Sequence, residues 1–112
     1  MEYTVKVTRK GGTADGWIVQ CFAWKDQNDP NPQRVPLIFE RDEDDYFAEC
    51  DLPPGLYSIV SDLIMGVEIE VGMTPETTII QPSGQEWPVT HKVPATQTRD
   101  IFPIYFEVEQ QS

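Results

Sequence analysis

The chain has 112 residues, which is the length of one domain, and its hydrophobic content of 39% is that of a folded protein rather than a disordered one. Nineteen acidic residues against eight basic ones give a net charge of −11 at pH 7. This charge repels phosphate, so nucleic acid and anionic membranes are excluded as expected partners. We therefore expect a single domain over residues 1–112.

The first half of the chain predicts four strands. Residues 3–8 alternate apolar and polar side chains, which is typical of a half-buried strand. Residues 17–24 are apolar on both faces, and such a strand belongs in the middle of a sheet. After a polar, proline-containing loop over residues 25–34, strands are expected over residues 35–40 and 46–52. These last two should pair as a hairpin around a charged turn.

The triplet Pro53-Pro54-Gly55 should stop the fourth strand and turn the chain sharply, because proline lacks a backbone donor and glycine tolerates unusual backbone angles. Further strands are predicted from Tyr57 onward and over residues 67–71, 77–81 and 102–108. Eight short strands and no helix predict an all-β, two-sheet antiparallel β-sandwich, transthyretin-like or immunoglobulin-like. Pro103 indicates that the last strand lies at an edge or begins irregularly there.

Residues 45–60, with the sequence DYFAECDLPPGLYSIV, resemble a feature of transthyretin-like sandwiches, including carboxypeptidase regulatory-like domains and collagen-binding B-type repeats. In those families a strand ends in Leu-Pro-Pro-Gly, and one residue later a Tyr begins alternating aliphatics. The present chain has Glu49 where they usually carry an aromatic residue. The resemblance implies a non-catalytic appendage, scaffold or adhesive module. B-type repeats often form a Lys–Asn isopeptide bond near an acid, but Asn28 and Asn31 lie in a predicted loop.

The two cysteines, Cys21 and Cys50, both fall within predicted strands, where they could face each other across a core. A disulfide between them would close a loop of about 30 residues and contribute roughly 3 to 4 kcal/mol. Because the N-terminal residues contain no apolar stretch typical of a secretion signal, two buried thiols are favoured and a disulfide is the alternative. No membrane-spanning segment is expected, and the default location is the cytoplasm.

No catalytic set is visible, and the chain is not expected to be an enzyme. The single histidine, His91, excludes sites that need two, and no patterned nucleophile accompanies it. Seven acids within residues 40–51 are expected on a solvated hairpin, the alternative being an acidic face that docks on a basic protein or mimics nucleic acid. Residues 26–29 and 42–45 offer oxygen ligands, but neither completes a calcium-loop pattern. No metal and no cofactor are predicted.

Two stretches are candidate binding sites. Trp17 and Trp24 are expected in the core, whereas Trp87 stands with His91 in an 18-residue, proline-rich stretch, residues 82–99, of the kind that often carries function. This stretch either binds a ligand or packs as a cover over a sheet edge. The second candidate is Leu63-Ile64-Met65, which either extends a strand into the core or forms an exposed contact patch.

These observations predict a non-catalytic binding or assembly module, and the partner that we expect first is another protein. One alternative is a carbohydrate-binding module that uses Trp87, since aromatic faces stack on sugar rings. The other is a phage or envelope structural subunit that self-associates through an exposed edge or through residues 63–65.

Overall fold

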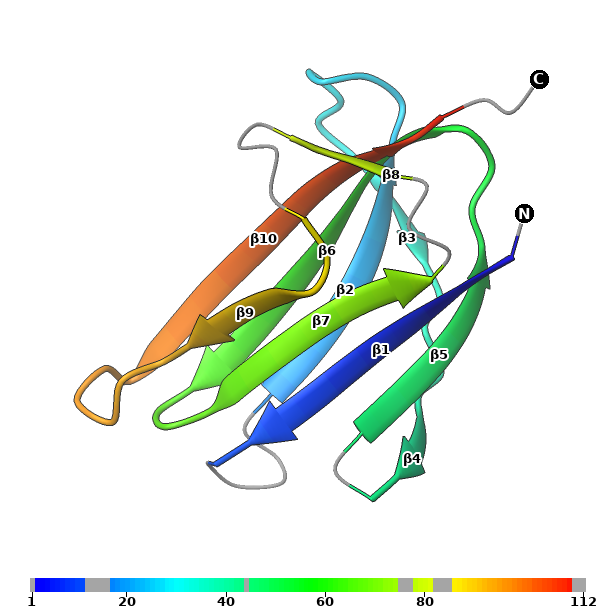
Figure 1. Cartoon of the computed structure of the whole chain (residues 1–112). Helices are drawn as coiled ribbons and strands as arrows, with labels where there is room; N and C mark the ends of the chain where they lie inside the picture. The colour runs from blue at the N-terminus through cyan, green and yellow to red at the C-terminus, as the bar shows by residue number, and fades with distance from the viewer. Residues whose placement is uncertain (1, 12–16, 44, 75–77, 82–85, 110–112) are drawn as a thin grey trace.

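The computed structural model describes residues 2–11, 17–43, 45–74, 78–81 and 86–109. The described residues form ten strands and two antiparallel five-stranded sheets, which lie as two layers in Figure 1. In order across each sheet, the β1 sheet is β4-β5-β1-β7-β9 and the β2 sheet is β3-β2-β6-β10-β8. The predicted all-β sandwich is confirmed. The strands are β1 (Glu2–Lys10), β2 (Trp17–Trp24), β3 (Gln33–Val35), β4 (Glu40–Asp42), β5 (Asp45–Asp51), β6 (Gly55–Ile64), β7 (Glu68–Thr74), β8 (Thr78–Gln81), β9 (Val89–Lys92) and β10 (Arg99–Val108).

The core fills the space between the two sheets and follows the alternation of the strands. In the β1 sheet, Val5 lies between Ala48 of β5 and Met73 of β7, and all three are buried. In the β2 sheet, Ile59 of β6 lies between Cys21 of β2 and Ile104 of β10, again all buried. Each such aliphatic side chain contributes about 1.5 to 3 kcal/mol on leaving water, so these inner faces hold the layers together.

The Pro53-Pro54-Gly55 turn carries the chain from β5 in one sheet to β6 in the other. The hydroxyl of Tyr57 donates a hydrogen bond of 2.5 Å to the carbonyl oxygen of Pro53, while its ring stacks on Phe106 at 5.6 Å between centroids. A tyrosine that bonds to backbone a few residues upstream is the tyrosine corner found in other β-sandwiches. The tyrosine therefore fastens the turn to the core.

The segment after β2 differs from the predicted strand over residues 35–40. β3 pairs with β2 in one sheet, whereas β4 pairs with β5 in the other, and residues 36–39 cross between them. The expected hairpin therefore exists, but it is made by the short β4. On the crossing segment, Phe39 packs edge-on against Trp17, which in turn packs on Tyr46 at 4.7 Å. This aromatic cluster closes one open side of the sandwich.

Two further details concern the last strand and the cysteines. At Pro103, β10 pairs with Val60 of β6, while β8 pairs only with residues 105–108, so the proline lies where the described strands give β10 a single neighbour. Cys21 and Cys50 are both buried, and the structure has no disulfide between them, as the favoured alternative expects. Burial, reinforced by the nearby Cys50, raises the pKa of the Cys21 thiol to about 12.

Candidate interaction surface

Trp87 is a core residue in the structure. Its side chain is 9% exposed and packs edge-on against Phe106 at 5.7 Å between ring centroids. The stretch that contains it includes a further strand, β9, which sequence periodicity did not predict. Of the two alternatives for residues 82–99, the described part of this stretch matches the packed cover, and Trp87 offers little surface for stacking on a sugar.

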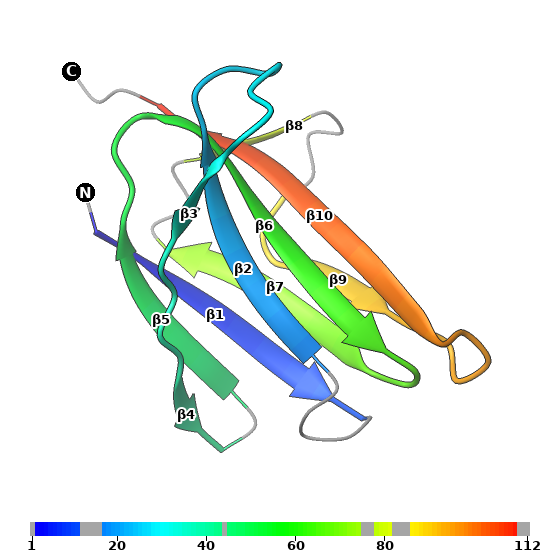
Figure 2. The same ribbon diagram turned by 180° about the vertical axis from the view of Figure 1, so that it is seen from behind.

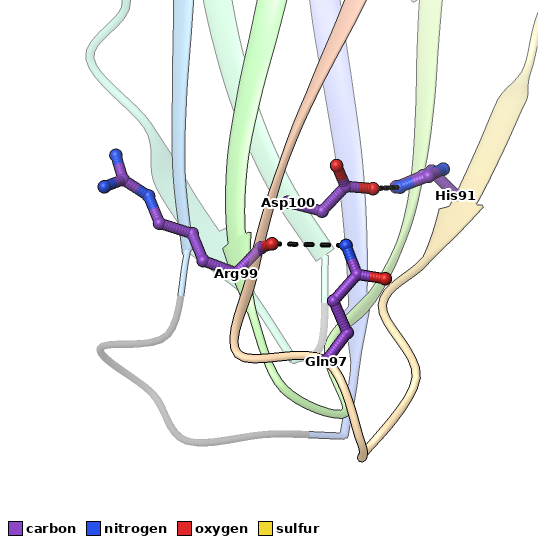
Figure 3. Close-up of polar contacts among 4 residues, drawn as sticks. All are labelled: His91, Gln97, Arg99 and Asp100. Atoms are coloured by element: carbon purple, nitrogen blue, oxygen red, sulfur yellow. Dashed lines mark hydrogen bonds and ion pairs between the residues drawn. The ribbon is translucent and has the colours of Figure 1, made fainter.

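His91 bridges the two sheets at the rim of the core. Its Nε2 atom lies 2.7 Å from Oδ2 of Asp100, and its ring stacks on Phe102 at 4.2 Å with nearly parallel planes. Figure 3 shows Asp100 reaching toward His91 while its neighbour Arg99 points to the opposite side of β10. The amide of Gln97 also donates to the carbonyl of Arg99 across the connecting loop. These contacts join β9 to β10, which belong to different sheets.

The trio Leu63-Ile64-Met65 divides between core and surface. Leu63 is completely buried, whereas Ile64 is 38% exposed and Met65, in the turn that leads from β6 to β7 in the other sheet, is also exposed. The two readings of this stretch are therefore each right for part of it. Because side chains alternate along a strand, Ile64 lies on the outer face of the β2 sheet.

Trp24 corrects the expectation that it lies in the core. Val19 and Cys21 of β2 face inward, so Phe22 and Trp24 face outward, where both are only half-buried. The indole nitrogen of Trp24 donates a 2.8 Å hydrogen bond to the hydroxyl of Ser58, and the ring lies 6.3 Å from that of Tyr105. Trp17 keeps its expected place and packs against the core.

Figure 2 views the sandwich from the side of the β2 sheet. Most outward side chains of its three central strands are apolar, interrupted by Gln20, Ser58 and three charged residues. Its most exposed members are Ile18 (57%), Ile101 (54%) and Tyr105 (43%). We call this surface the apolar face. Its apolar side chains are Ile18, Phe22 and Trp24 on β2, Leu56, Val60 and Ile64 on β6, and Ile101, Pro103 and Tyr105 on β10.

The outer face of the β1 sheet is built differently. On β5, Asp45 and Glu49 point outward, and Lys6 of β1 bridges to Asp45 at 3.3 Å. β7 presents Glu68 and Glu70, and β9 presents Thr90. Apart from Phe47 of β5, whose ring lies 5.6 Å from Lys6 Nζ, this mixture of charged and polar groups is typical of a sheet face in water. The contrast between the two faces makes the apolar face the candidate contact surface of this chain.

The apolar face carries balanced charge although the chain is strongly acidic. Its outward charged groups are Arg34 of β3, Asp62 of β6, and Arg99 and Glu107 of β10. Arg99 Nε donates to Asp62 Oδ1 at 2.7 Å, and this bond lowers the pKa of the Asp62 carboxyl. Two acids and two bases on the face leave 17 acids and 6 bases elsewhere, so the whole net charge of −11 lies outside it.

An open pocket of about 410 Å³ lies beside Trp24, between the end of β2 and the loop that follows. The carboxylate of Asp29 accepts hydrogen bonds from the backbone amides of Lys25 and Asn31, which lower its pKa and fix the loop. Lys25, Asn31 and Gln33 supply the polar lining. The pocket is open to solvent and its lining is mostly polar, with Trp24 as an aromatic wall.

Within the ranges that the structure describes, no three His, Cys, Asp or Glu side chains are arranged to hold a metal ion. The same ranges contain no helix long and apolar enough to cross a membrane. Comparison with protein-family models, with curated proteins and with solved structures finds no match. The function must therefore be argued from the geometry of this chain.

Proposed function

We propose that this chain is a non-catalytic β-sandwich module that acts by binding another protein through the apolar face. The observation that carries the proposal is the contrast between the sheets: one presents charged and polar groups outward, and the other presents isoleucines and aromatic rings. Isolated exposed apolar residues are normal on a protein surface, but a contiguous apolar face is typical of a contact site.

The size of the face indicates what binding through it can supply. Strands about 4.8 Å apart that rise about 3.3 Å per residue give the three central strands, about nine residues each, an area of roughly 400 Å². This is about half of the roughly 800 Å² per partner that a stable interface buries, which is the size range of weak and transient contacts. The face therefore supports a specific but reversible contact.

A non-catalytic role is supported by how the single histidine is used. The side chain of His91 holds the sheets together in two ways: its Nε2 atom contacts Asp100, and its ring lies flat on Phe102. The resemblance of residues 45–60 to transthyretin-like sandwiches supports the same conclusion, because those domains act mostly as scaffolds or adhesive modules. A hydrolytic or transferase activity that is lost in His91→Ala would contradict it.

Site-specific photo-crosslinking tests the proposal. A photoreactive phenylalanine analogue replaces Ile101 on the apolar face or, as the control, Thr90 on the outer face of the β1 sheet. In extracts of cells that make the protein, position 101 should give a saturable protein adduct that excess unlabelled wild-type chain competes away. The Ile18→Lys chain should compete poorly, because a lysine there charges the face.

Two results would refute the proposal. One is equal labelling from positions 101 and 90, which would indicate nonspecific collision. The other is the absence of any protein adduct from position 101 both in extracts and with the purified chain.

Carbohydrate binding is a second candidate, now centred on Trp24 rather than Trp87. The observation in its favour is the fixed indole of Trp24 beside Tyr105, next to a pocket with polar groups from Lys25, Asn31 and Gln33. Titration with a panel of soluble glycans should then change the tryptophan fluorescence of the wild type but not of Trp24→Ala. No response across a broad panel would exclude this candidate.

A further inference from the structure

We infer that the protein bound at the apolar face is a second copy of this chain, in a two-fold dimer whose axis runs along β6. The inference rests on the proposed function and names its partner. It depends on three properties of the face: its internal symmetry, its charge and its extent.

The residues on either side of β6 match one another in two rows, whereas Gln20 lies across from Pro103 and Trp24 across from Glu107 in two others. Strand register places Ile18 of β2 and Ile101 of β10 on the two sides of Asp62. Four residues closer to the Pro53 turn, Phe22 and Tyr105 flank Ser58 in the same way. The face therefore presents an isoleucine on both sides in one row and an aromatic ring on both sides in another.

A two-fold axis along β6 turns this internal match into an interface. It lays β2 of one copy over β10 of the other, because a two-fold operation in the plane of the interface exchanges the two sides of β6. Ile18 then meets Ile101 of the second copy, and Phe22 meets Tyr105, each contact occurring twice. Sheets that pack face to face keep their strands within about 30° of parallel, so the contacts near the axis are retained.

The charge distribution favours a second copy over a basic partner. A basic protein would be drawn to residues 40–51, which hold seven acids, and these lie on β4, β5 and their turn in the β1 sheet. The apolar face has two acids and two bases and so no net charge, and each Asp62, which the axis along β6 places opposite Asp62 of the second copy, is hydrogen-bonded to Arg99 of its own chain. In a face-to-face dimer the two acidic β1 sheets lie on opposite outer sides. The two β2 sheets then lie between them, and because stacked sheets are roughly 10 Å apart, the distance between the acidic sheets is well beyond a Debye length of about 8 Å.

The extent of the face predicts a weak dimer. Stable interfaces bury about 800 Å² per partner, roughly twice the area that the three central strands supply. We expect a dissociation constant on the order of 100 µM, so that association is visible only in concentrated samples.

Sedimentation velocity from about 10 µM to about 1 mM, a range that brackets this constant, tests the inference. The wild type should shift from monomer toward dimer as concentration rises. Ile18→Lys and Ile101→Glu should each weaken association roughly tenfold or more, because each places a charge against an isoleucine of the second copy. The control Thr90→Lys, on the other outer face, should associate like the wild type. Far-UV circular dichroism verifies that all variants fold, as expected for exposed positions.

The double variant Ile18→Lys, Ile101→Glu tests the position of the axis. Within one chain these two positions lie two strand spacings apart, about 10 Å, so the new charges do not pair with each other. Across the proposed axis each lysine meets a glutamate, and the double variant should regain association relative to either single variant.

Each outcome decides the inference. A wild type that stays monomeric at about 1 mM overturns it, given the constant expected for this area. A double variant no better than the single ones, or a control that weakens association as much, also overturns it. If the wild type is monomeric while position 101 crosslinks to a different protein, the second copy is excluded and the proposed function stands. If neither association nor any crosslink is found, both fail.

Discussion

The hydroxyl of Tyr57 should be worth about 1 kcal/mol of folding free energy. Its hydrogen bond to the Pro53 carbonyl joins the turn before β6 to a ring that is 6% exposed and stacked on Phe106. Tyr57→Phe keeps the ring and removes only the bond, whose net value is about 0.5 to 1.5 kcal/mol. Pro53 is exposed, so water can reach its carbonyl, which keeps the loss near the middle of this range. Tyr57→Ala also loses the packing and should cost about 3 to 5 kcal/mol.

Urea unfolding followed by tryptophan fluorescence, at a protein concentration low enough to keep the chain monomeric, measures both values. Tyr105→Phe is the matched control, because that ring is exposed on the apolar face and its change should stay within about 0.5 kcal/mol. The reasoning would be refuted if Tyr57→Phe unfolded at the same urea concentration as the wild type. It would also be refuted if the Tyr105 control lost as much stability.

Three further predictions concern backbone geometry and pH. Gly11→Ala should destabilise by roughly 1 to 3 kcal/mol in thermal or urea unfolding, because Gly11 has φ +71° and a Cβ there would lie 2.5 Å from the Gly66 carbonyl oxygen; Gly72→Ala, which meets ordinary contacts, should change stability far less. The Cys21 thiol should make the folding free energy fall by about 1.4 kcal/mol per pH unit as pH rises from about 9 toward 12, because this thiol ionises at lower pH in the unfolded chain than in the folded one. Equal slopes of stability against pH in the wild type and in Cys21→Ala would contradict this. The hydrogen bond from Thr8, with help from Lys6, lowers the pKa of the Asp45 carboxyl, so the stabilisation by Asp45 is present above about pH 4 and is lost as pH falls through the lowered pKa. Asp45→Asn should therefore reduce the loss of folding free energy on acidification. An unchanged loss would count against this prediction.

The inner faces of the sandwich could be predicted because burial on one side imposes a period of two. Tyr3, Val5 and Val7 alternate with polar residues, and all three are buried as their pattern predicts. The turn at Pro53 was equally visible, since its residues restrict the backbone whatever surrounds them. The hydrogen bond from Tyr57 back to Pro53 was not, because it depends on where the ring docks.

The apolar face was present in the sequence but was interpreted wrongly. Residues 17–24 are apolar on both sides, which predicted a strand buried from both directions. β2 does lie inside its sheet, between β3 and β6, yet a two-layer sandwich leaves the outer side of every strand uncovered. Periodicity tells which strands have two apolar sides, and it does not tell how many layers cover them. The second apolar side of residues 17–24 was therefore the feature of the sequence from which the apolar face could have been predicted.

Segments without regular pairing were the least predictable. Leu37 and Phe39 alternate as in a strand, but they lie on the segment that crosses from one sheet to the other and pack against the side of the core. For Trp87 the sequence left a binding surface and a packed cover both open, because its neighbours are polar and rich in proline. Its burial against Phe106 depends on a strand about twenty residues further along the chain.

The most direct test of the central claim is hydroxyl-radical footprinting of the apolar face in the isolated monomer and in the assembly that the crosslink identifies. The account predicts that Phe22, Trp24 and Tyr105 oxidise readily in the monomer and become strongly protected in the assembly. Phe47, on the outer face of the β1 sheet, should oxidise alike in both. Unchanged oxidation of the three aromatic residues of the apolar face, or protection confined to Phe47, would contradict the claim that this face is the contact surface.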